Sequence, residues 1–169
     1  FKIAIKSYLS IILSKMTQFI SKKVFKGELI SGKVALKIDR NILKVVSKNY
    51  KVILVTGTNG KTTTTSMIYN VLKGNGLDVI TNATGQTLPG IVSTFVANYK
   101  FSSNKERYAV IEVDEANLKF ITEYITPEII TVTNLFRDQL DRYGEVYTTL
   151  NKILEGVVKV PSTTLLLNG

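Results

Sequence analysis

The chain of 169 residues contains no cysteine and no histidine. Without cysteine it can form neither a disulfide nor a thiolate metal site, and without histidine it lacks the commonest general base and the commonest metal ligand. Any chemistry in these residues therefore has to use carboxylates, lysines, hydroxyls and backbone groups.

Long uncharged stretches are also missing at the amino terminus. The first 24 residues are largely apolar, but five lysines interrupt them, at positions 2, 6, 15, 22 and 23. A bilayer crossing needs about 20 apolar residues in succession, and Lys15 also breaks the apolar centre of a secretory signal. The apolar residues recur at helical spacing, which predicts an amphipathic helix. We favour a helix packed on the domain over one lying on a membrane surface.

Composition fits one compact domain, because 44% of the residues are hydrophobic and the length is that of a single core. The formal charge is +9, and many of the 22 Lys and Arg residues crowd the first 51 positions. No aromatic stacking motif accompanies them, so we do not expect nucleic acid as a partner. The chain begins at Phe1 and stops just after a strand-like run, so we expect it to be a piece of a longer protein.

Strand-like and helix-like segments alternate from Lys51 onward. The expected strands are 51–55, 78–81, 108–113, 129–133 and 163–167, and the expected helices are 62–73, 90–99, 117–125 and 146–158. Val and Ile on both faces of the strands predict a parallel sheet covered by helices, an α/β fold of the P-loop NTPase type. Before it we expect a helical segment and linker over 1–50, with the linker at 27–37 and a short helix at 38–48.

The stretch that follows the first strand has the composition of a phosphate-binding loop. Gly57 and Gly60 free the turn, Lys61 supplies a cation, and Thr62 supplies a hydroxyl for Mg²⁺. We expect Thr58, Asn59 and Thr63 to contribute backbone groups to the same site. A strict Walker spacing would place one more glycine at position 55, where this chain has Val55. A plain β-turn with a solvated lysine is the alternative, but it would need neither Lys-Thr after it nor a buried strand before it.

Polar clusters follow the strands, where parallel sheets bind their ligands. They lie at 56–62, 82–89, 112–117 and 134–145. At 112–117 the sequence starts Glu-Val-Asp-Glu, and strand periodicity would put Glu112 and Asp114 on one face. We expect Glu112 to bind Mg²⁺, and Glu115 to be part of an exposed acidic helix start. Arg137, Asp138, Asp141 and Arg142 crowd the last cluster, and surface ion pairs alone would not explain their place at a strand end.

The motifs together resemble the ATPase domain of the Mur ligases. They are Val55-Thr-Gly-Thr-Asn-Gly-Lys-Thr62, Glu112-Val-Asp-Glu115 and Thr133-Asn-Leu-Phe-Arg-Asp-Gln-Leu-Asp-Arg-Tyr-Gly144, in the family's order, and the family's loop also lacks the earlier glycine. Residues 51–169 would then be a Mur ligase-like ATP-binding central domain. Gln139 and the segment Gly32–Asp39 are most similar to the branch that amidates lipid II.

The resemblance implies activation of a carboxylate by ATP as an acyl phosphate, which an amine then attacks. Lys61 would contact the γ-phosphate, Thr62 and Glu112 would hold Mg²⁺, Asn134 would lie near the adenine, and Asn82 and Gly85 would contact substrate. The acceptor would be the D-glutamate α-carboxyl of lipid II in peptidoglycan synthesis. Ammonia would come from a glutaminase subunit of the GatD type, and the protein would be cytoplasmic or peripheral at the inner face of the membrane.

Two departures from the family pattern concern metals and substrate. Many Mur ligases carry His where this chain has Gln139, and an amide oxygen is a poorer ligand for most metals than imidazole, which weakens a second metal site there. The loop at 82–87 reads Asn-Ala-Thr-Gly-Gln-Thr, so only Asn82 and Gly85 carry over. Zinc is expected only in a part of the protein beyond residue 169. The rival interpretations are an amino-acid-adding Mur ligase and a nucleotide-binding module without catalysis.

Overall fold

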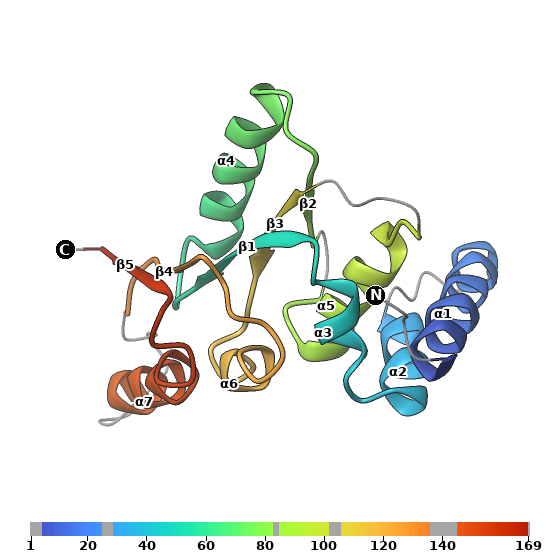
Figure 1. Cartoon of the computed structure of the whole chain (residues 1–169). Coiled ribbons are helices and arrows are strands. Elements are labelled where there is room, and N and C mark those ends of the chain that lie inside the picture. The colour runs from blue at the N-terminus through green and yellow to red at the C-terminus, as the bar shows by residue number, and fades with distance from the viewer. Residues whose placement is uncertain (1–4, 25–28, 83–84, 102–105, 136–144, 169) are drawn as a thin grey trace. The chain divides into compact units, whose positions relative to one another are not determined.

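The computed structural model describes the chain except for residues 1–4, 25–28, 83–84, 102–105, 136–144 and 169 (Figure 1). The chain divides into two compact units. One contains residues 1–50 and 82–106, and the other contains residues 51–81 and 107–169.

The unit with residues 51–81 and 107–169 is built on a five-stranded sheet. Its strands are β1 Tyr50–Thr56, β2 Val79–Thr81, β3 Arg107–Glu112, β4 Ile129–Val132 and β5 Thr164–Leu167, in the order β2-β3-β1-β4-β5. The strands run parallel, with Ile53 opposite Ile129 and Val79 opposite Tyr108. The central strands β1, β3 and β4 carry the apolar core, in which Leu54, Val110, Ile111 and Ile130 have no exposed surface.

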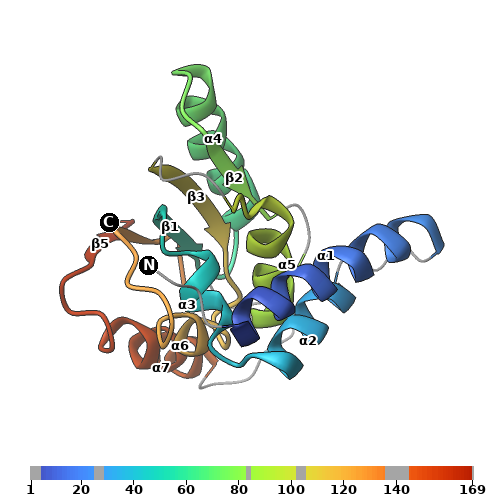
Figure 2. The same ribbon diagram turned by 45° about the vertical axis from the view of Figure 1, so that its right-hand side comes forward.

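Helices cover both faces of this sheet. Helix α4, Lys61–Gly74, packs against β2 and β3, whereas α6, Leu118–Ile121, and α7, Glu145–Val157, pack on each other on the opposite side (Figures 1 and 2). The prediction of a parallel α/β sheet flanked by helices is confirmed. The helix expected at 117–125 is much shorter than predicted, because the Thr122 hydroxyl bonds back to the Leu118 carbonyl and the chain then turns.

The other unit is a cluster of helices: α1 Ile5–Val24, α2 Leu29–Ile38, α3 Ile42–Val46 and α5 Leu88–Asn98. The prediction of a linker at 27–37 was wrong, since most of these residues form helix α2. Glycine is needed at position 32 because α2 contacts α5 closely there. A Cβ on Gly32 would lie 1.8 Å from the Pro89 carbonyl oxygen, and the Gly32 N–H donates to Ser93 Oγ at 2.8 Å. The helix expected at 38–48 is shorter, covering only α3.

The expected amphipathic helix at the amino terminus is present as α1, which packs along α2. Ser10 donates to the Ala35 carbonyl at 3.0 Å, and Ser7 donates to Asp39 at 2.6 Å. Among the helices that the structure describes, none is both long enough and apolar enough to cross a bilayer.

Candidate functional site

Strand β1 runs directly into the loop that the sequence marks for phosphate binding. Gly57 and Gly60 have φ of +124° and +81°, values that favour glycine, and α4 begins at Lys61 with Gly60 as its N-cap. A Cβ on Gly57 would lie 2.4 Å from Thr133 Oγ1 and 2.8 Å from the Asn134 carbonyl oxygen. The loop is therefore pressed against the end of β4, and its backbone N–H groups at the start of α4 form a site that suits an anion.

We expect Gly57→Ala to destabilise the protein more than Gly60→Ala. Both substitutions force a positive φ on alanine, which costs about 1–2 kcal/mol. Only the methyl group at position 57 also overlaps Thr133 and Asn134, the two residues after β4, which adds about 1–3 kcal/mol, because nothing lies within 4 Å of a Cβ on Gly60. Urea unfolding of the two variants measures the difference, and equal losses would show that the contact with these two residues carries no energy.

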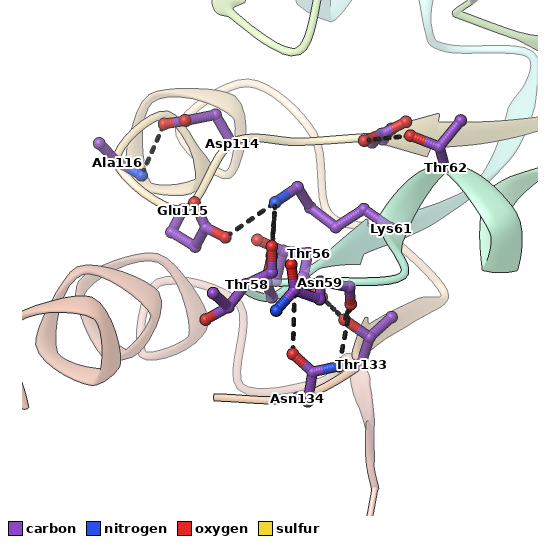
Figure 3. A network of polar contacts seen from close by, with 12 residues as sticks. Thr56, Thr58, Asn59, Lys61, Thr62, Asp114, Glu115, Ala116, Thr133 and Asn134 are labelled. Atoms are coloured by element: carbon purple, nitrogen blue, oxygen red, sulfur yellow. Dashed lines mark hydrogen bonds and ion pairs between the residues drawn. The ribbon is translucent and has the colours of Figure 1, made fainter. Parts of the chain in front are cut away.

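Lys61 points back over the loop. Its ammonium donates to the carbonyl oxygens of Gly57 at 2.5 Å and Thr58 at 3.3 Å, and it forms an ion pair with Glu115 at 3.0 Å (Figure 3). The side chains of Lys61 and Glu115 are only 14% and 16% exposed. The expectation that Glu115 belongs to an exposed acidic helix start was therefore wrong. Its carboxylate is instead the acidic partner of Lys61 beside the loop.

Thr62 and Glu112 connect α4 to the end of β3. The Thr62 hydroxyl donates to Glu112 Oε1 at 3.0 Å, and Glu112, the last residue of β3, is 5% exposed. A hydroxyl and a carboxylate oxygen are ligands that Mg²⁺ accepts, and adjacent ligands of an octahedral Mg²⁺ lie about 2.9 Å apart. The pair therefore fits a magnesium site completed by substrate oxygens.

Asp114 does not share this arrangement. Strand β3 ends at Glu112, so strand periodicity stops before Asp114. Its carboxylate instead accepts the Ala116 N–H at 3.0 Å and the Asn117 side-chain amide at 3.2 Å. Asp114 thus shapes the turn before α6 and leaves Glu112 as the buried carboxylate at the end of β3.

The end of β4 clamps the loop through Asn59. The Asn134 side chain accepts the Asn59 N–H at 2.9 Å and donates to the Asn59 carbonyl at 3.0 Å (Figure 3). The Thr133 hydroxyl donates to the same carbonyl at 2.7 Å, and the Thr58 N–H donates to the Asn134 carbonyl at 3.0 Å. These bonds use both backbone groups of Asn59, so they hold the middle of the loop against the two residues that follow β4.

A largely apolar cavity of about 270 Å³ opens beside Asn134. It lies between β4, β5 and α7, and it is lined by residues that include Leu135, Leu150 and Leu165. Since Asn134 lines the cavity and also bonds to the phosphate loop, cavity and loop are neighbours. A flat ring with apolar faces fits such a space.

The structure brings the predicted residues of the loop, Glu112 and Asn134 into one network in the sheet-bearing unit. Asn82 and Gly85 belong to the helical unit, where the Asn82 amide donates to the Gly85 carbonyl at 3.3 Å. Thr63 is exposed on the first turn of α4. Gln139 and the charged residues 137, 138, 141 and 142 lie outside the described residues.

Sequence reasoning missed the roles of Glu115 and Thr133 as partners of the loop. The role of Glu115 could have been predicted from its position three residues after Glu112, just beyond the end of a strand. For Thr133, the signal was its place directly before Asn134 at the end of a buried strand.

Residues 55–162 match the model of the Mur ligase middle domain. The chain therefore belongs to the Mur ligase family. Among curated relatives it is 43% identical over 98% of its length to lipid II isoglutaminyl synthase (glutamine-hydrolyzing) subunit MurT of Streptococcus pneumoniae. It is 35% identical over 97% of its length to the subunit of the same name in Staphylococcus aureus.

The chain spans 37% of the length of these two relatives. A UDP-N-acetylmuramate–L-alanine ligase of Buchnera aphidicola is 30% identical over 74% of the chain, which is 25% of that relative. Among solved structures, MurF ligase of Thermotoga maritima in complex with ADP aligns with a TM-score of 0.62 at 20% identity. The alignment covers 79% of this chain and 32% of that one, and it supports the fold.

Proposed function

We propose that the intact protein amidates the α-carboxyl group of D-glutamate in lipid II, as the synthetase subunit of a glutamine-hydrolysing ligase. The observation that carries the proposal is the 43% identity to MurT over 98% of the chain, together with the contacts of Lys61, Thr62 and Glu112 at one loop. On this proposal the protein is an ATP-dependent carbon–nitrogen ligase.

ATP binds with its phosphates on the loop that joins β1 to α4. Lys61 exchanges Glu115 for an oxygen of the γ-phosphate, and the N–H groups at the start of α4 hold the phosphates in place. Thr62 and Glu112 would hold Mg²⁺, which would neutralise phosphate charge when bound. The adenine lies in the cavity next to Asn134.

Two displacements then make the amide. The glutamate carboxylate oxygen bonds to the γ-phosphorus while the bond to the ADP oxygen breaks, which gives an acyl phosphate and ADP. Ammonia bonds to the acyl carbon, the bond to phosphate breaks, and the nitrogen loses a proton. Because negative charge moves during the first step, the work of Lys61 is electrostatic, and no side-chain nucleophile is needed.

A glutaminase subunit of the GatD type supplies the ammonia. Free ammonia is mostly protonated near neutral pH, so an acyl phosphate captures it efficiently only when a partner releases it nearby. Lipid II lies in the membrane, and we therefore place the protein in the cytoplasm at the membrane's inner face. Asn82 and Gly85 are the residues that we assign to substrate binding on the helical unit.

Incubating the intact protein with ATP, Mg²⁺ and lipid II tests the proposal. We expect ammonium at raised pH, or glutamine with the glutaminase, to convert the acid to the amide, which mass spectrometry detects. The matched control replaces the ammonia source with free amino acids, and we expect no product from it. A gain in mass of a whole amino-acid residue would instead identify an amino-acid-adding ligase, and ATP binding without any product would leave a nucleotide-binding module.

A further inference from the structure

Helix α1 presents large apolar side chains to solvent. Ile5, Leu9, Leu13, Met16 and Phe19 are 88%, 50%, 38%, 57% and 74% exposed, respectively. Because 100° separates successive residues of a helix, these five side chains form one stripe along it. We call these five residues the apolar stripe. The stripe extends over about 21 Å at 1.5 Å per residue, so it is a continuous face and not an isolated apolar side chain.

The face of α1 that packs on the rest of its unit is made mostly of small polar residues. Ser7, Ser10, Ile11 and Ser14 are buried. Ser10 donates a hydrogen bond to Ala35 of α2, and Ser7 donates one to Asp39, the residue after α2. The usual arrangement of an amphipathic helix on a globular domain is thus reversed, since the larger apolar side chains face outward. Packing within the described residues does not account for the stripe.

The net positive charge of the chain is concentrated in its first 50 residues, which include α1. Residues 1–50 contain eleven Lys and Arg residues against two acidic residues, so they carry the whole formal charge of +9. Residues 51–169 contain eleven of each sign and are neutral overall. Of the two acidic residues, Asp39 is buried and accepts the hydrogen bond from Ser7. The exposed basic residues of this segment include Lys6, Lys33, Lys37 and Arg40.

Lysine and aromatic side chains border the apolar stripe. At 100° per residue, Lys6 and Lys15 fall on opposite margins of it. The Lys15 ammonium donates to the Tyr99 carbonyl at 2.7 Å and lies 5.6 Å from the centre of the Phe101 ring. That ring in turn packs on Tyr8, with ring centres 5.2 Å apart, and both rings are about half exposed. Apolar centre, aromatic border and lysine flanks are the features of helices that lie in a lipid interface.

We infer that α1 binds the surface of an anionic lipid bilayer, lying in its plane with the apolar stripe inserted among the lipids. The excess of positive charge in residues 1–50 selects a negatively charged surface, and the stripe supplies the apolar area that insertion needs. A helix that lies in the interface also agrees with the absence of a membrane-spanning helix among the described elements. Helix α1 packs on its unit as expected, but through its small polar face, and the membrane-surface role that we ranked second applies to the opposite face.

The inference extends the proposed location at the membrane and is independent of the amidation chemistry. Its test therefore uses vesicles without lipid II and measures binding alone. The intact protein is mixed with vesicles of phosphatidylcholine, with and without phosphatidylglycerol, and floated through a density gradient. We expect it to float with the vesicles that contain phosphatidylglycerol, and added salt to weaken this binding.

A pair of double variants locates the contact. We expect Met16→Ser with Phe19→Ser to lower binding at least about tenfold, because two large apolar side chains no longer insert. The matched control is Met67→Ser with Tyr147→Ser, whose side chains are 64% and 74% exposed on α4 and α7, and it should bind like the unaltered protein. Lys6→Glu, which keeps the stripe intact, should weaken binding about five- to thirtyfold.

Three results would overturn the inference. The first is that the unaltered protein floats with neither kind of vesicle. The second is an equal loss of binding in the two double variants. The third is a change of oligomeric state, measured by light scattering without vesicles, in the variant Met16→Ser with Phe19→Ser and not in its control. The apolar stripe would then be a contact between protein chains.

Discussion

Lys61→Ala lowers ATP turnover of the intact protein about 100- to 1,000-fold in our expectation, because it removes the cation that faces the transferred phosphoryl group. The lysine is 14% exposed and paired with Glu115. Its loss therefore leaves a mostly buried carboxylate without its ion pair, which costs about 1–3 kcal/mol of stability. Steady-state phosphate release, together with urea unfolding, measures both effects.

A double variant separates the catalytic effect from the structural one. Lys61→Ala combined with Glu115→Gln removes the charge that the single variant leaves unpaired, so stability should return while turnover stays low. Lys73→Ala is the control for a cation on the same helix, since Lys73 is exposed and bonds only to the Tyr69 hydroxyl among the contacts we describe. Normal turnover in a folded Lys61→Ala protein would mean that the loop does not hold the phosphates.

Glu112→Gln has the second large effect that we expect. The substitution keeps the shape of the side chain but removes its charge, and Glu112 is the buried carboxylate that faces Thr62. Activity should fall about 100-fold at fixed Mg²⁺, and the Mg²⁺ concentration for half-maximal activity should rise about tenfold. A titration with Mg²⁺ at constant ATP gives both values.

Glu115→Gln is the matched control, because it makes the same chemical change three residues away. Glu115 faces Lys61 rather than Thr62, so we expect its variant to change the affinity for ATP and to leave the Mg²⁺ requirement unaltered. Equal shifts in the Mg²⁺ requirement at both positions would show that both carboxylates bind the metal.

Much of the sheet-bearing unit could be predicted, because its signals are local. Val52, Leu54 and Val55 identify a buried strand by composition, and the glycines after them identify a tight turn. In a parallel sheet every such turn falls at one edge, so the order of elements along the chain predicts that Lys61 and Glu112 lie at the same edge. Their close approach depends in addition on β3 and β1 being neighbours in the sheet, which the order along the chain does not give.

The contacts that escaped prediction join distant parts of the chain. Asn59 and Asn134 are 75 residues apart, and their pairing depends on β1 and β4 being neighbours in the sheet. The Lys61–Glu115 ion pair depends on where β3 ends, which period-two geometry does not determine. Helix α2 was missed because Gly32 suggested a linker, whereas the glycine is there to let α2 approach α5. The outward face of α1 was unpredictable because hydrophobic spacing gives the periodicity of a helix without saying which face meets the domain.

The clamp on Asn59 also bears on the entropy of nucleotide binding. A free loop residue loses about 1–2 kcal/mol of conformational entropy when a ligand fixes it. Here the side chain of Asn134 and the hydroxyl of Thr133 fix the middle of the loop through contacts within the protein itself. Folding has thus already met most of this ordering cost, so more of the energy of phosphate contact remains available for affinity.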